Sequence, residues 1–134
     1  MATLRDETFP IRSGDDIVKI RQITREVALM QGFSLVDQTK IVTASSELAR
    51  NTLEHGGGGD ARIEAVLEGT RRVVRLTFVD HGPGIPNLEN ALRDGFTTGH
   101  GMGLGLSGSK RLVNDFEIHS EVGKGTRVMI ARWK

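Results

Sequence analysis

The stretch VVRLTFVDHGPGIP, residues 73–86, holds the most clearly patterned strand of the chain and the turn that follows it. Its side chains alternate between two faces, with Val74, Leu76 and Phe78 on one and Val73, Thr77 and Val79 on the other. A strand that is apolar on both faces is covered on both, which is typical of a central position in a sheet. The stretch therefore predicts a sheet that extends to both sides of residues 73–80.

The end of this strand allows two interpretations. Asp, Gly and Pro are common turn residues, so DHGPGIP, residues 80–86, can be an ordinary turn. Alternatively, Asp80 is a carboxylate fixed at the end of a buried strand, where it can accept a hydrogen bond from an exocyclic amine. Gly82 and Gly84 lack a Cβ, so a flat ring could approach the backbone there.

Two amphipathic helices precede the strand. SGDD introduces the first helix, which ends near Gly32 and carries an apolar stripe of Ile17, Ile20, Thr24, Val27 and Met30. The second helix begins at Ser34, where Asp37 completes a pattern like a capping box, and ends at the glycine run 56–59. Its inward face is predicted to consist of Ile41, Ala44, Leu48 and Thr52.

The remaining strands and a third helix complete the predicted fold. TFPI, residues 8–11, suits a short edge strand, and residues 61–68 alternate with period two before an EGTR turn. Residues 104–115 read as a helix, and FEIHSEVGKGTRVMIARW reads as a hairpin that turns at 123–125. The prediction is one domain over residues 1–134, an α+β two-layer sandwich in which three helices cover one face of a mixed, mostly antiparallel sheet.

The composition limits the partners. The 18 basic and 17 acidic residues leave a net charge of +1, which gives no electrostatic reason to expect nucleic acid or a membrane surface. The absence of cysteine excludes disulfides, thiolate metal sites and cysteine nucleophiles. The N-terminal MATLRDETFP is acidic where a signal peptide would be apolar, so a cytoplasmic protein is expected.

Three polar residues follow one side of the second predicted helix. Glu47, Asn51 and His55 are spaced four apart, so they form a row beside the inward stripe. Such a row can be a solvated flank that ends in a structural histidine. It can also be a site, because a carboxylate can accept a proton and an amide oxygen suits a hard cation such as Mg²⁺.

The glycine-rich stretch GHGMGLGLSGSK, residues 99–110, does not fit the common nucleotide fingerprints. A dinucleotide motif must follow a strand directly, and the phosphate-binding loop of the Walker type needs a glycine before its lysine. Gly101, Gly103 and Gly105 instead leave backbone N–H groups free, just before a helix whose N-terminus carries positive charge. This arrangement predicts a phosphate cradle.

The three motifs occur in an order that resembles a known family. ELARNTLEH resembles the N box, DHGPGI the first glycine box and GMGLGL the second glycine box of the GHKL ATPases, which include gyrases, heat-shock chaperones, histidine kinases and the MutL group. The resemblance spans nearly the whole chain. The short length and the stretch GFSLVDQTKIVTASSELARN are similar to the small serine kinases of bacterial partner-switching pathways, and most of all to the stressosome switch kinases.

The resemblance implies roles for individual residues on a Bergerat ATP-binding fold. Glu47 would be the general base for a serine or threonine hydroxyl, Asn51 would ligate Mg²⁺, and Asp80 would bind the adenine amine. Residues 86–105 would form a lid over ATP. The other nucleotide-binding positions would shape the adenine pocket or contact the phosphates: Gly82, Gly84, Gly101, Gly103, Gly105, Leu106 and Thr126. His55 could be structural or could contact a phosphate.

The expected function is a Mg-ATP-dependent serine/threonine kinase that phosphorylates a STAS-domain regulator and then activates a serine phosphatase. Two alternatives stay open. The first is an anti-sigma factor kinase that holds a sigma factor, and the second is a regulatory module that binds ATP without transferring phosphate. The resemblance also allows a homodimer through the sheet edge.

Overall fold

A computed structural model describes residues 1–93 and 105–134. The described residues form a five-stranded sheet in the order β1-β2-β3-β5-β4, and the four strand pairings are antiparallel. The elements in chain order are β1 Ala2–Ile11, α1 Gly14–Met30, α2 Leu35–Glu54, β2 Gly59–Glu68, β3 Arg71–Asp80, α3 Leu88–Ala91, α4 Gly105–Arg111, β4 Asp115–Glu121 and β5 Gly125–Trp133.

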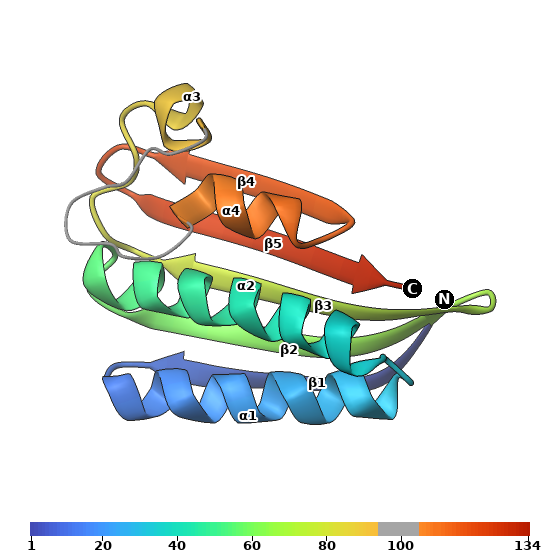
Figure 1. Ribbon diagram of the computed structural model, residues 1–134. Helices are drawn as coiled ribbons and strands as arrows, with labels where there is room; N and C mark the ends of the chain where they lie inside the picture. Colours follow the sequence, from blue (N-terminus) through green and yellow to red (C-terminus); the bar gives the residue numbers. More distant parts are fainter. Residues whose placement is uncertain (94–104) are drawn as a thin grey trace.

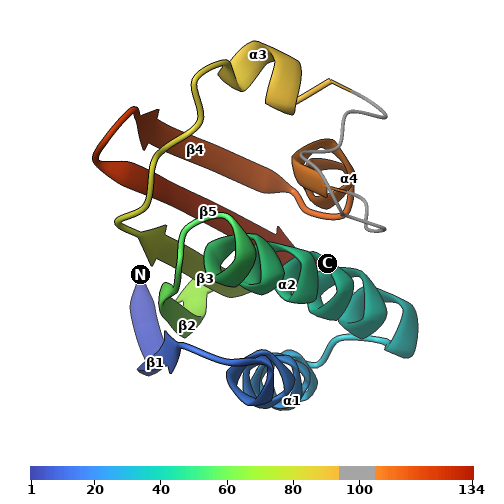
Figure 2. The ribbon, with the colours of Figure 1, turned by 90° about the vertical axis from the view of Figure 1, so that its left-hand side faces the viewer.

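The molecule has two layers, as expected from the sequence. Figure 1 shows α1, α2 and α4 lying across the same face of the sheet, and the turned view in Figure 2 shows the helices and the strands as separate layers. The short helix α3, which the sequence pattern did not reveal, lies beyond β4 in both views. The α+β fold class is therefore confirmed, with an antiparallel sheet rather than a mixed one.

The strand β3 occupies the centre of the sheet, as its sequence predicted. It pairs with β2 on one side and with β5 on the other. The register sets Gly59 of β2 and Thr126 of β5 opposite Asp80, the last residue of β3. Three strand ends thus meet at Asp80.

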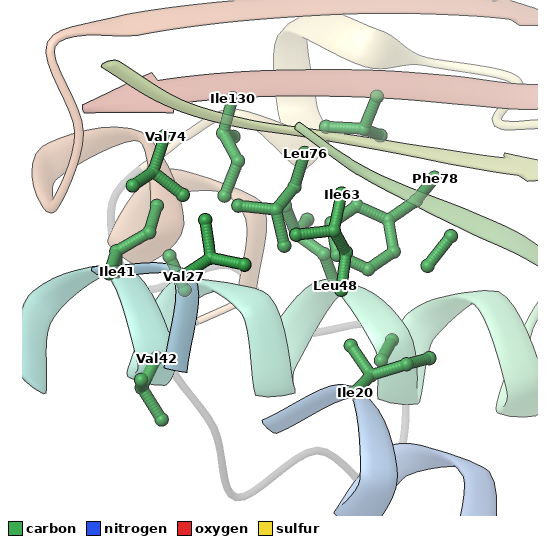
Figure 3. Packing of buried hydrophobic residues seen from close by; sticks show 14 of the residues in the cluster. Ile20, Val27, Ile41, Val42, Leu48, Ile63, Val74, Leu76, Phe78 and Ile130 are labelled. Carbon is green, nitrogen blue, oxygen red and sulfur yellow. The ribbon is translucent and has the colours of Figure 1, made fainter. Parts of the chain in front are cut away.

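The core lies between the sheet and the helices. Figure 3 shows Ile41 and Leu48 of α2 directed toward Val74, Leu76 and Phe78 of β3. All five of these side chains are buried. Burying a side chain of this size stabilises a fold by about 1.5–3 kcal/mol, so this contact fixes α2 against the centre of the sheet.

The inward stripe of α1 differs from the prediction at its end. Ile17, Ile20, Thr24 and Val27 are buried as predicted, but Met30 is 45% exposed. Successive residues of a helix are rotated by about 100° about its axis. Residue 31 therefore lies over the buried face again. Gln31 is fully buried there, and its Nε2 donates to the carbonyl oxygens of Val66 and Val73, at 3.0 and 2.8 Å.

Several element boundaries also differ from the prediction. The edge strand β1 begins at Ala2 rather than at residue 8, and α4 ends at Arg111, with β4 beginning at Asp115. The capping pattern at the start of α2 is confirmed, because Ser34 Oγ accepts the backbone N–H of Asp37 at 3.2 Å. Among the described residues, no helix has the length and apolar character that a membrane span requires.

Candidate functional site

A cavity of about 280 Å³ lies where α2 and β3 end and β5 begins. In Figure 1 these ends share one side of the molecule, and Figure 2 looks onto that side. Most of the lining is apolar, and a few polar groups converge on it, as is usual for small-molecule sites. The lining residues are Leu48, Asn51, Thr52, His55, Gly56, Phe78, Asp80, Pro83, Gly84, Ile85, Pro86, Ala91, Gly105, Leu106, Thr126 and Val128.

Asp80 is held in place by backbone groups from two segments. Its Oδ1 accepts the N–H of Gly82 at 3.0 Å and the N–H of Thr126 at 3.2 Å. Two donors on one oxygen fix the plane of the carboxylate and leave Oδ2 to accept further hydrogen bonds. The sequence prediction that Asp80 is a fixed acceptor at a strand end agrees with this geometry.

Glycines allow the chain to close around Asp80. A Cβ on Gly56 would lie 2.3 Å from Asp80 Cγ, and a Cβ on Gly82 would lie 2.7 Å from Gly56 Cα. Gly84 has a φ of +77°, and a Cβ there would lie 2.4 Å from the carbonyl oxygen of Glu121. Each distance is far below an ordinary contact, so the packing at this end of the cavity depends on the missing side chains.

The polar row on α2 lies only partly in the cavity. Asn51 and His55 line it, whereas Glu47 lies one turn earlier on the same helix and outside the lining. Glu47 Oε1 accepts a hydrogen bond from Arg50 Nη1 at 3.1 Å, and the Glu47 side chain is 14% exposed. The sequence predicted the row, but the ion pair with Arg50 is a feature that only the structure reveals.

The second glycine box is described only from Gly105 onward. Gly105 has a φ of +67°, and both Gly105 and Leu106 line the cavity. Gly101 and Gly103 lie outside the described residues, as does most of the predicted lid. The phosphate cradle therefore stays a prediction.

Two contributors to the site were missed from the sequence. Gly56 belongs to a run that was interpreted only as a helix stop, although one glycine would have been enough for that. Ser120 contacts Thr126 and the loop after β3 through its hydroxyl group. The alternation of residues 116, 118 and 120 in the predicted hairpin indicates that Ser120 faces inward. It does not indicate which groups the Ser120 hydroxyl contacts.

Comparisons with known proteins identify the family of this chain. Residues 36–134 match the family described as "Histidine kinase-, DNA gyrase B-, and HSP90-like ATPase". The serine/threonine-protein kinase RsbT of Bacillus subtilis (strain 168) is 43% identical over 118 residues, which cover 88% of this chain and 89% of that protein.

More distant relatives include anti-sigma factors. The anti-sigma F factor of Anoxybacillus flavithermus (strain DSM 21510 / WK1) is 33% identical over 106 residues, which cover 74% of this chain and 71% of the relative. A crystal structure of the RsbU and RsbW domains of Rv1364c from Mycobacterium tuberculosis has the same fold, with a TM-score of 0.67 and 22% identity. That match covers 96% of this chain and 32% of the longer one. The chain therefore belongs to the histidine kinase-, DNA gyrase B- and HSP90-like ATPase family, within the branch of partner-switching serine/threonine kinases that includes RsbT.

Proposed function

We propose that this kinase transfers the γ-phosphoryl group of ATP to a serine or threonine hydroxyl of a STAS-domain partner protein. The observation that carries the proposal is the Asp80 carboxylate, fixed by the N–H groups of Gly82 and Thr126 in a cavity whose wall also holds Asn51. In this proposal Asp80 would accept a hydrogen bond from a base, and Asn51 would offer its amide oxygen to a cation. Glu47 lies one helical turn from that amide.

The cavity suits an adenine ring. Leu48, Phe78 and Val128 supply apolar walls, and Gly84 lines the same cavity. Asp80 Oδ2 is a carboxylate oxygen that can accept, so it would take a hydrogen bond from the exocyclic amine of adenine. The residues present therefore fit ATP at its base end.

In this proposal Mg²⁺ would arrive with the nucleotide. No group of three or more His, Cys, Asp or Glu side chains in residues 1–93 and 105–134 is placed to hold a metal ion by itself. Mg²⁺ is usually bound by one or two protein oxygens together with substrate phosphates and water. Asn51 would be such a ligand, and the cation would neutralise charge on the phosphates.

Glu47 would act as the general base. It would take the proton of the attacking hydroxyl as that oxygen bonds to the γ-phosphorus and the bond from phosphorus to the bridging oxygen of ADP breaks. Arg50 holds one carboxylate oxygen of Glu47, so the other oxygen would be the one directed at the substrate. Catalysis of this kind relies mainly on positioning and on charge neutralisation.

Similarity to two kinds of relative supports two partner classes. Similarity to RsbT favours a switch kinase that modifies a STAS-domain regulator and then activates a serine phosphatase. Similarity to anti-sigma F factors favours a second candidate function, the sequestration of a sigma factor. Affinity capture with purified partners separates the two, because recovery of a sigma subunit rather than a STAS-domain protein would support the second function.

Nucleotide binding tests the site itself. Gly56→Ala would place a methyl group against the Asp80 carboxylate and displace it. Calorimetry should then show a loss of Mg-ATP affinity of about tenfold or more, because the loss of one hydrogen bond costs about 1.4 kcal/mol. Gly14→Ala is the matched control, because a Cβ there meets nothing within 4 Å. Equal affinities for the two variants would place the ATP site elsewhere.

A further inference from the structure

A hydroxyl group joins three segments behind the Asp80 end of the cavity. Ser120 lies near the end of β4, opposite Thr126 in the register. Its Oγ accepts the backbone N–H of Ile85 at 2.7 Å, and it lies 2.8 Å from Thr126 Oγ1 and 3.2 Å from the carbonyl oxygen of Gly125. Ile85 and Thr126 line the cavity, whereas Ser120 stands behind them.

The number of protons in this network determines its direction. A serine hydroxyl has one proton and can accept two hydrogen bonds. Ile85 N–H occupies one acceptor position of Ser120, and the Gly125 carbonyl can only accept. All the groups are paired when Ser120 donates to Gly125 and Thr126 donates to Ser120. Thr126 Oγ1 then has no proton left for the cavity and can only accept.

The same end of the cavity already holds a second acceptor. Asp80 Oδ1 accepts two N–H groups, one of which belongs to Thr126, and Oδ2 is the second acceptor oxygen of the same carboxylate. Any ligand or water that contacts Asp80 Oδ2 or Thr126 Oγ1 must therefore donate. An amino group satisfies this requirement, whereas a carbonyl oxygen in the same place would face two half-buried acceptors without a hydrogen bond.

We propose that Ser120 is a positioning residue that fixes the hydrogen-bonding direction of Thr126 and thereby helps the site select 6-aminopurine over 6-oxopurine nucleotides. The inference rests on the proposed function, because it assumes that the cavity binds the base of ATP. It adds a residue that acts through Thr126 and does not itself line the cavity.

The test compares two nucleotides on the full chain. ITP differs from ATP in its base, where a carbonyl oxygen replaces the amine and N1 carries a proton. In Ser120→Ala, Thr126 is released to donate, so the ratio of ATP affinity to ITP affinity should fall about tenfold by calorimetry. Ser120→Thr keeps a hydroxyl and should restore the ratio. His119→Ala, the adjacent exposed residue of β4, should leave the ratio unchanged.

A double-mutant comparison tests whether Ser120 acts through Thr126. Thr126→Val also removes the hydrogen bond between the Ser120 and Thr126 hydroxyl groups. Adding Ser120→Ala to Thr126→Val should therefore lower the ratio of ATP affinity to ITP affinity no further than Thr126→Val alone. Additive losses would overturn the proposal. Ser120→Cys replaces the alanine variant if circular dichroism shows that the latter is unfolded.

The outcomes distinguish this inference from the proposed function. If the wild-type chain binds neither nucleotide, the proposed function fails. If the wild-type chain prefers ATP and Ser120→Ala weakens ATP and ITP by the same factor, the hydroxyl only supports the loop at Ile85. In that case the inference about base selection is wrong, while the proposed function stands.

Discussion

At the scale of single residues, one ion pair connects the start of α2 to the end of the sheet. Arg132 Nη2 donates to Asp37 Oδ1 at 2.6 Å, and Arg132 Nη1 donates to the carbonyl oxygen of Leu112 at 2.9 Å. The hydrogen bond from Arg132 is the main cause that lowers the pKa of Asp37 below its ordinary value, with a smaller contribution from Ser34. The charged form of Asp37 is therefore favoured by folding.

This pair predicts a dependence of stability on pH. Because the pKa of Asp37 is lower in the folded chain, the pair stabilises the fold above the unfolded pKa of about 3.9, and this contribution is lost as the pH falls through the folded value. The difference in unfolding free energy between the wild type and Asp37→Asn should be constant from pH 7 to 5 and shrink below about pH 4.

Urea unfolding at several pH values measures this difference. Asp115→Asn is the control, since Asp115 is exposed and lies on the opposite side of the sheet from α2 in the alternation of β4. A difference for Asp37→Asn that stays constant down to pH 3 would contradict the assignment.

Sequence patterns predicted the position of a single residue well where a local motif determines that position. Asp80 follows a strand and precedes glycines, and Glu47 and Asn51 share a helix face, so their placement could be predicted. Gly56 and Ser120 were missed because each owes its role to a residue from another segment, and only strand register brings those segments together.

At the scale of elements, α2 serves both the core and the site. Leu48 is 1% exposed, packs into the core and also lines the cavity, while Asn51 lies on the same helix three residues on. The packing that stabilises α2 therefore also sets the position of its polar row. A loss of core contact along this helix should affect both stability and nucleotide binding.

A comparison of two leucines of α2 separates the effect of burial on stability from the effect of losing a leucine from the helix. Leu48→Ala should lower the unfolding free energy by about 2–5 kcal/mol, because it removes buried methyl groups and leaves a cavity. Leu35→Ala changes the same residue type where it is 70% exposed and should stay within about 0.5 kcal/mol of the wild type. Equal losses in chemical denaturation would show that Leu48 is not a core residue.

Element types were predictable, whereas element ends were less so. Regular patterns of apolar residues predicted α1, α2, β2, β3 and the hairpin of β4 and β5. The strand β3 is apolar on both of its faces. β1 was underestimated because its first residues are polar and edge strands need less burial. The buried stripe of α1 ends at Gln31, whose side-chain amide nitrogen donates to two strand carbonyl oxygens. A pattern of hydrophobic residues does not indicate a buried polar residue of this kind.

At the scale of the whole molecule, the order of the strands creates the site. The chain leaves β3 at Asp80, passes through the segment that includes α3 and α4, and enters the sheet at its edge as β4 before β5 returns beside β3. The start of β5 therefore comes back to the end of β3, and Thr126 meets Asp80. The fold class was predictable from the sequence, but this return needed the structure.

The proposed function depends on phosphoryl transfer to a STAS-domain protein with Glu47 as the general base. The most direct measurement is intact-protein mass spectrometry of such a partner after incubation with Mg-ATP and either the wild type, Glu47→Gln or Glu54→Gln. Glu54 lies on the same helix and is exposed, so it controls for loss of a charge. We expect one added phosphoryl group with the wild type and with Glu54→Gln. With Glu47→Gln the rate should be about 10²- to 10⁴-fold lower at unchanged ATP affinity. Equal rates for all three proteins, or no added mass despite ATP binding, would contradict the proposed function.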